Sequence, residues 1–157
     1  MLYYLPLMLA MFDPTVGAQA RPVTMATAVP SHFTNYTEAY REAQREKKPL
    51  LVILNPPEAT SAVNVEDVRK TQQRRELLGK FVLVVIDTST EHGETVNKLF
   101  DQKSLPHVSV IDREQQWQLF RTSKKLQGDD WNRVLETFQN GERTATLNLD
   151  VKLPCFT

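Results

Sequence analysis

Cysteine is almost absent from this chain. Cys155 is the only one among 157 residues, which excludes a disulfide bond within the chain. An excess of either charge is also missing, because 19 Lys and Arg residues balance 19 Asp and Glu residues. Surfaces that bind nucleic acids usually carry a basic excess, so we expect no nucleic-acid partner. The apolar fraction of 41% is typical of a globular chain, here long enough for one domain with a sizeable core.

Long hydrophobic runs are missing too, apart from one near the N-terminus. Residues 2–12 resemble the apolar core of a signal peptide and are too few to cross a bilayer as a helix. A small-x-small pattern, Ala18-Gln19-Ala20, follows. We therefore expect residues 1–20 to be a signal peptide and the mature chain to be exported, periplasmic or secreted, without a membrane span. No Lys or Arg precedes the run, so an ordinary hydrophobic N-terminal segment is the alternative.

The rest of the chain alternates between helical and strand patterns. Residues 21–33 have two prolines and no periodicity, which predicts a linker. Asn35 is a suitable N-cap for a helix with one apolar stripe. Continuous apolar runs at 50–54 and 81–86 predict two strands buried on both faces. Helices are expected at about 62–78, at 95–100 and from 128, two alternating strands at 107–111 and 117–121, and a tail at 141–157.

This order of elements predicts the fold class. Strands that alternate with helices favour parallel pairing, and two consecutive alternating strands favour an antiparallel hairpin. We therefore expect an α/β domain over residues 34–140, with a central mixed sheet of about four to five strands and helices on both faces.

Two short motifs resemble the thioredoxin-like domains of exported bacterial proteins. Residues 36–54, YTEAYREAQREKKPLLVIL, resemble the helix and strand that open these domains. Residues 105–112, LPHVSVID, resemble the segment in which the family places a cis-proline before its hairpin. The resemblance extends over residues 34–139 and implies the thioredoxin fold.

The family's catalytic Cys-x-x-Cys motif has no counterpart here. By the resemblance it would fall at Ala59, Thr60, Ser61 and Ala62. Thiol–disulfide exchange needs one thiolate to attack and a second thiol to resolve the mixed disulfide, and this degenerate loop has neither. Many family members also place an acidic residue beneath the cysteines, and Ile53 occupies that position in the same register.

Pro106, in contrast, matches the family's cis-proline. The resemblance implies a cis Leu105–Pro106 bond and, beside it, a groove that receives an extended peptide. His107 would line this groove, although a surface histidine on a strand is the alternative. We expect no cofactor and no metal, because the three histidines are far apart in the sequence and have no cysteine nearby.

Two functions of different classes remain open from the sequence. The first is a redox-inactive binding or accessory module that holds a protein or peptide partner at the Pro106 groove. The second is a thiol–disulfide redox protein that acts through Cys155 alone by forming mixed disulfides. The first is favoured because the fold is retained while the cysteine pair is lost, whereas the second rests only on the presence of a thiol.

Overall fold

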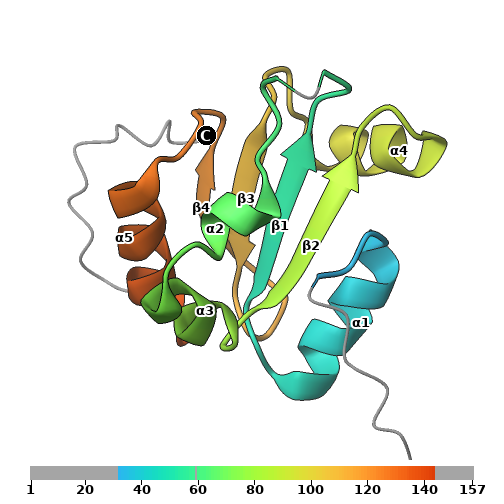
Figure 1. Ribbon diagram of the computed structural model, residues 1–157. Coiled ribbons are helices and arrows are strands. Elements are labelled where there is room, and N and C mark those ends of the chain that lie inside the picture. Colours follow the sequence, from blue (N-terminus) through green and yellow to red (C-terminus); the bar gives the residue numbers. More distant parts are fainter. Residues whose placement is uncertain (1–31, 59, 144–157) are drawn as a thin grey trace, which may run out of the picture.

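The computed structural model describes residues 32–58 and 60–143, and its elements follow the predicted order (Figure 1). They are α1 (Tyr36–Glu46), β1 (Leu50–Asn55), α2 (Val65–Val68), α3 (Gln72–Leu78), β2 (Val82–Asp87), α4 (Glu91–Phe100), β3 (His107–Ile111), β4 (Gln118–Thr122) and α5 (Gly128–Phe138). The expected signal peptide lies outside the described residues. None of the helices in the described ranges is long and apolar enough to cross a membrane.

The strands form one mixed sheet in the order β2-β1-β3-β4. β1 pairs in parallel with β2, where Leu50 lies opposite Val82. It pairs antiparallel with β3 on its other side, where Leu54 lies opposite His107. β3 and β4 form the predicted antiparallel hairpin, which leaves β4 at one edge of the sheet. The predicted α/β class and mixed sheet are therefore confirmed.

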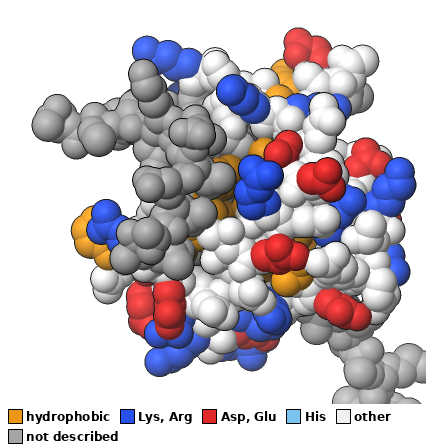
Figure 2. All heavy atoms as spheres, turned by 90° about the vertical axis from the view of Figure 1, so that its left-hand side faces the viewer, with side chains coloured by type: hydrophobic (Ala, Val, Ile, Leu, Met, Phe, Trp, Pro, Cys, Tyr) orange, Lys and Arg blue, Asp and Glu red, His pale blue; other side chains and the backbone are white. Residues whose placement is uncertain are grey.

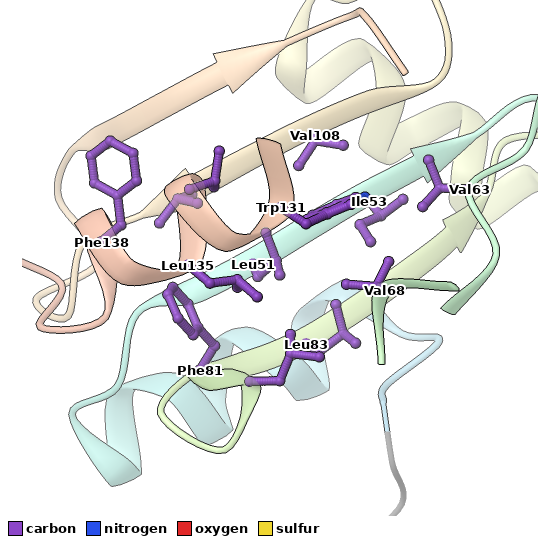
Figure 3. Close-up of a cluster of buried hydrophobic side chains, with 13 residues drawn as sticks. Leu51, Ile53, Val63, Val68, Phe81, Leu83, Val108, Trp131, Leu135 and Phe138 are labelled. Carbon is purple, nitrogen blue, oxygen red and sulfur yellow. The ribbon is translucent and has the colours of Figure 1, made fainter. Parts of the chain in front are cut away.

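Helices cover both faces of this sheet, as predicted (Figure 1). On one face, Leu51 and Ile53 of β1 join a buried cluster with side chains of α2, α3 and α5, including Trp131 (Figure 3). On the other face, Val52 of β1 packs with α1 and α4, where Ala39 is fully buried. Successive residues of a strand point to opposite faces, so a strand covered on both sides needs an unbroken apolar run.

The start of α1 is also as the sequence predicts. Asn35 Oδ1 accepts a hydrogen bond from the backbone N–H of Glu38 at 3.2 Å, which satisfies one of the unpaired donors of the first turn. Ala39 and Ala43 form the buried stripe. The helix ends at Lys47, which has a φ of 51°.

Two helices differ from their predicted extent. The single helical segment expected at about 62–78 is wrong, because the structure has two short helices there, α2 and α3. Asn64 caps the first helix and Thr71 caps the second, so the side chain of Thr71 starts a new helix where composition alone allowed one to continue. Residues 95–100, expected to be part of a helix, lie in α4, which begins at Glu91 because the side chain of Thr90 caps its first turn.

Residues on both borders of the expected domain pack onto it. Phe33, expected in the linker, adds a bridge to the outer side of β2: its N–H donates to Leu83 O and its carbonyl accepts from Val85 N, both at 2.8 Å. Gly141, expected in the tail, has a φ of 62° and accepts a hydrogen bond from Arg113 N at 3.1 Å. A Cβ at Gly141 would lie 2.8 Å from Arg113 N, so this position requires glycine. The other residues of both segments lie outside the described ranges, apart from His32 and residues 142–143.

Candidate functional site

The degenerate loop follows β1 and is closed by a side chain at its base. Asn55, the last residue of β1, donates from Nδ2 to Val63 O at 3.1 Å and accepts at Oδ1 from Val63 N at 2.8 Å. A primary amide offers one donor and one acceptor side by side, and here it satisfies both backbone groups of one residue. The two ends of the loop are thereby held together by one side chain.

Within this loop, the predicted residues carry no activated group. Thr60 is exposed, Ser61 and Ala62 are half-buried, and Ala59 lies outside the described residues. The Ser61 hydroxyl donates to the backbone carbonyl of Glu58 at 3.3 Å. A hydroxyl becomes a nucleophile only when a base takes its proton, and a backbone carbonyl is no such base. The described part of the loop therefore holds Ser61 in a turn rather than in a catalytic arrangement.

The helix after the loop begins too late to assist an anion in it. α2 starts at Val65, beyond the positions that correspond to the cysteine pair. Its first turn is capped by Asn64, whose Oδ1 accepts from Glu66 N at 2.9 Å. Helix N-termini lower the pKa of a thiol that lies against their free N–H groups. Here one of those groups is already paired with a side chain, which weakens the site for a thiolate.

The buried position beneath the loop is apolar. Ile53 is fully buried, and Figure 3 shows its side chain beside the indole of Trp131, with Val63 and Val68 close by. A carboxylate in this cluster would lose its hydration, at a cost of several kcal/mol unless it found a partner. Position 53 therefore contributes to the core and offers no acid–base group.

Pro106 lies at the same end of the sheet as the degenerate loop. The peptide bond between Leu105 and Pro106 is cis. Pro106 directly precedes β3, and β3 begins with His107 opposite Leu54 near the end of β1 (Figure 1). Pro106 is buried, whereas Leu105 is half-buried and packs partly against the cluster under α1 and α4. We refer to the surface formed by residues 60–62, Leu105 and Pro106 as the Pro106 site.

His107 is not the surface histidine that the alternative reading expected. The side chain is almost fully buried, with 1% of its area exposed, because helices cover both faces of β3. Its Nδ1 lies 3.3 Å from Ser123 Oγ, and its ring centroid lies 6.2 Å from that of Phe100. Its Nε2 is buried and has no hydrogen-bond partner among the residues that the structure describes. Burial, with a smaller contribution from the positive charge of Arg121, lowers the pKa of His107 to about 4, so the imidazole is neutral at neutral pH.

His92 has a structural role. His92 on α4 accepts a hydrogen bond at Nε2 from the backbone N–H of Tyr36, at the start of α1, at 3.1 Å. The residues that the structure describes contain no group of three or more His, Cys, Asp or Glu side chains suited to a metal ion. Cys155 lies outside the described residues.

Asn55 and Ser123 are the site residues that sequence reasoning missed. Asn55 stands at the end of an apolar run before two prolines, and this pattern identifies only the end of a strand. Its backbone carbonyl also accepts from Thr88 Oγ1 at 2.8 Å, which ties the ends of β1 and β2 together. Ser123 contacts His107 across the hairpin, a pairing that depends on strand register.

Comparison with known proteins places this geometry in a family. The model of the Thioredoxin-like family matches residues 32–113, which include β1, the degenerate loop and Pro106. The chain belongs to the thioredoxin-like family. This thioredoxin-like chain has a single cysteine, Cys155, which is not in the loop.

A solved structure supports the same fold. A thioredoxin from Thermus thermophilus superposes with a TM-score of 0.57 at 15% sequence identity, covering 68% of this chain and 85% of that one. A protein described as DsbH oxidoreductase gives a TM-score of 0.46 at 15% identity, covering 76% of this chain and 89% of that one. No curated protein matches the sequence. At this identity the Thermus thermophilus structure shows the fold and not the activity.

Proposed function

We propose that this protein is an exported, redox-inactive binding module that holds an extended segment of a protein partner at the Pro106 site. One observation carries the proposal: the thioredoxin-like fold and its proline are retained, while the only cysteine lies at position 155. Binding of an extended segment needs backbone groups and an apolar contact but no thiol. Export rests on the signal-peptide pattern of residues 1–20.

The shape of the site supports binding rather than turnover. Leu105 is half-buried and offers part of its side chain to a partner. The loop opposite is closed by the two hydrogen bonds between Asn55 and Val63, so little ordering should be needed when a partner binds. Charge does not favour a nucleic acid, because basic and acidic side chains are interspersed over the face that carries α5 (Figure 2).

A reductase assay tests the redox-inactive part of the proposal. We expect the mature chain to show no thioredoxin-like turnover in reduction of insulin disulfides, because exchange needs a second thiol to release the mixed disulfide. Turnover that survived the Cys155→Ser substitution would contradict the proposal. Turnover abolished by that substitution would instead favour action through Cys155.

Affinity capture from a periplasmic or extracellular fraction tests the site. We expect the wild-type chain to retain a partner equally with and without reductant, and Leu105→Ser to lose it. Trp117→Ser is the matched control, because Trp117 is 60% exposed at the hairpin end of the sheet, away from Pro106. Equal capture by both variants would refute the assignment to the Pro106 site, and a partner released by reductant would support the Cys155 alternative.

A further inference from the structure

A cavity of about 370 Å³ lies against the start of β2, away from the Pro106 site. β2 is an edge strand, and among the described residues only Phe33 pairs with its outer side. Apolar side chains, Phe33, Leu78, Phe81 and Val82, form part of its lining. The volume is at the lower end of the range of about 300–1,000 Å³ that is usual for small-molecule sites. We call this space the β2-edge cavity.

The acidic side of the cavity is already neutralised. Glu42 and Glu46 of α1 both line it. The Glu42 carboxylate accepts hydrogen bonds from the guanidinium of Arg45, one of them at 2.8 Å from Nε. Glu46 Oε2 lies 2.8 Å from Lys48 Nζ. A cationic ligand would therefore have to compete with existing ion pairs.

Across the cavity lies the guanidinium of Arg75, and the hydrogen bonds that it makes to described residues all go to neutral oxygens. Arg75 Nη1 donates to the carbonyl of Arg69 at 3.1 Å, and Nη2 donates to Gln72 Oε1 at 2.9 Å. A guanidinium carries five N–H donors and favours bidentate contact with a carboxylate. The side chain of Arg75 is exposed, so those of its N–H donors that make no hydrogen bond within the chain can reach a ligand.

We propose that the β2-edge cavity binds a small apolar monocarboxylic acid. The carboxylate pairs with Arg75, and the hydrocarbon part lies over Leu78, Phe81 and Val82. We propose a single negative charge because one carboxylate is matched by one bidentate contact with the guanidinium of Arg75. The apolar residues named are only 5–6% exposed, so the contact area is small and the dissociation constant should be in the range of about 0.1–1 mM.

Titration of the full chain by ¹⁵N NMR tests this proposal, with hexanoate, 1-hexanol and hexylammonium as probes. We expect hexanoate to shift the amide signals of residues 81–83 and the Nε–H of Arg75. We expect hexanol to bind at least about tenfold more weakly, because a charged hydrogen bond contributes about 1.5–3 kcal/mol. Hexylammonium should produce no shifts at these residues.

Substitutions test whether the carboxylate of hexanoate binds to Arg75. Arg75→Gln should remove the hexanoate shifts, and Arg75→Lys should retain part of the affinity. Arg41→Gln, on the exposed side of α1 and outside the cavity, should bind as the wild type does. The proposal is overturned if hexanol binds as well as hexanoate, if a correctly folded Arg75→Gln binds unchanged, or if no shift occurs at residues 81–83. It stands independently of the function proposed for the Pro106 site.

Discussion

Lowering the pH from 7 to 4.5 should destabilise the fold through His107. The imidazole is buried, and its Nε2 has no hydrogen-bond partner within residues 32–58 and 60–143. The charge of Arg121 opposes a second positive charge nearby. In the unfolded chain the same imidazole is hydrated and takes up a proton near its ordinary pKa of 6.5. Between pH 6.5 and 4 the unfolded state therefore binds a proton that the folded state does not, and stability must fall as the pH falls.

The size of this effect follows from the two pKa values. Burial and Arg121 lower the pKa of His107 from 6.5 to about 4, and one pKa unit corresponds to about 1.4 kcal/mol. The full loss is therefore about 3 kcal/mol, reached when the pH has fallen to about 4. Above pH 6.5 both states are neutral at this residue and it contributes no pH dependence. The contribution of His107 therefore makes the free energy of unfolding highest above pH 6.5.

Urea unfolding at pH 7.0, 6.0, 5.0 and 4.5 measures this contribution. Because carboxylates also titrate towards the acid end of this range, the relevant quantity is the difference between the wild type and His107→Gln, which carries no titratable group at this position. We expect the free energy of unfolding of the wild type to fall by about 2–3 kcal/mol more than that of the variant between pH 7.0 and 4.5. Parallel curves for the wild type and His107→Gln would refute the reasoning.

Four further substitutions test the loop and the packing. Asn55→Ala removes both hydrogen bonds to Val63 and should lower the free energy of unfolding by about 1–3 kcal/mol, with faster hydrogen exchange at the Val63 amide. Gly93→Ala should cost at least about 2 kcal/mol in thermal unfolding, because its Cβ would lie 1.9 Å from a backbone carbonyl of β2, whereas Gly79→Ala, with a nearest contact of 3.2 Å, should change stability little. A thiol introduced by Ser61→Cys should keep a pKa of about 8.5, as measured by alkylation rate against pH; a pKa well below 7 would show that the loop still activates thiolates.

The sequence was sufficient for elements whose signals are local. The Asn35 cap, the alanine stripe of α1 and the apolar runs of β1 and β2 each lie within a short window, and the structure has them within one or two residues. The mixed sheet follows from their order. In contrast, the start of α3 at Thr71 depends on one side chain competing with the backbone for a hydrogen bond, which composition does not reveal.

Features of the site that depend on tertiary contacts could not be predicted from the sequence. The alternation around Val108 predicts one polar, solvent-facing side for β3, and His107 and Ser109 are nevertheless buried. The reason is that β3 lies between β1 and β4 and is covered on both faces, so burial is decided by strand order rather than by alternation. The amide clamp of Asn55 similarly requires Val63 to return to the end of β1.

The absence of cysteines from this loop is one of several features that would not support a reactive thiolate. The loop is closed by Asn55, the first turn of the following helix is capped by Asn64, and the buried position below is occupied by Ile53. A reactive thiolate would use free N–H groups at a helix start and a nearby proton acceptor. Asn64 occupies one of the helix N–H groups, and Ile53 provides no proton acceptor. Pro106 and the half-buried Leu105 are present, and in our proposal they contact the extended segment of a partner. Because the loop lacks support for a thiolate while Pro106 and Leu105 are present, we propose that the site binds a partner and does not catalyse a redox reaction.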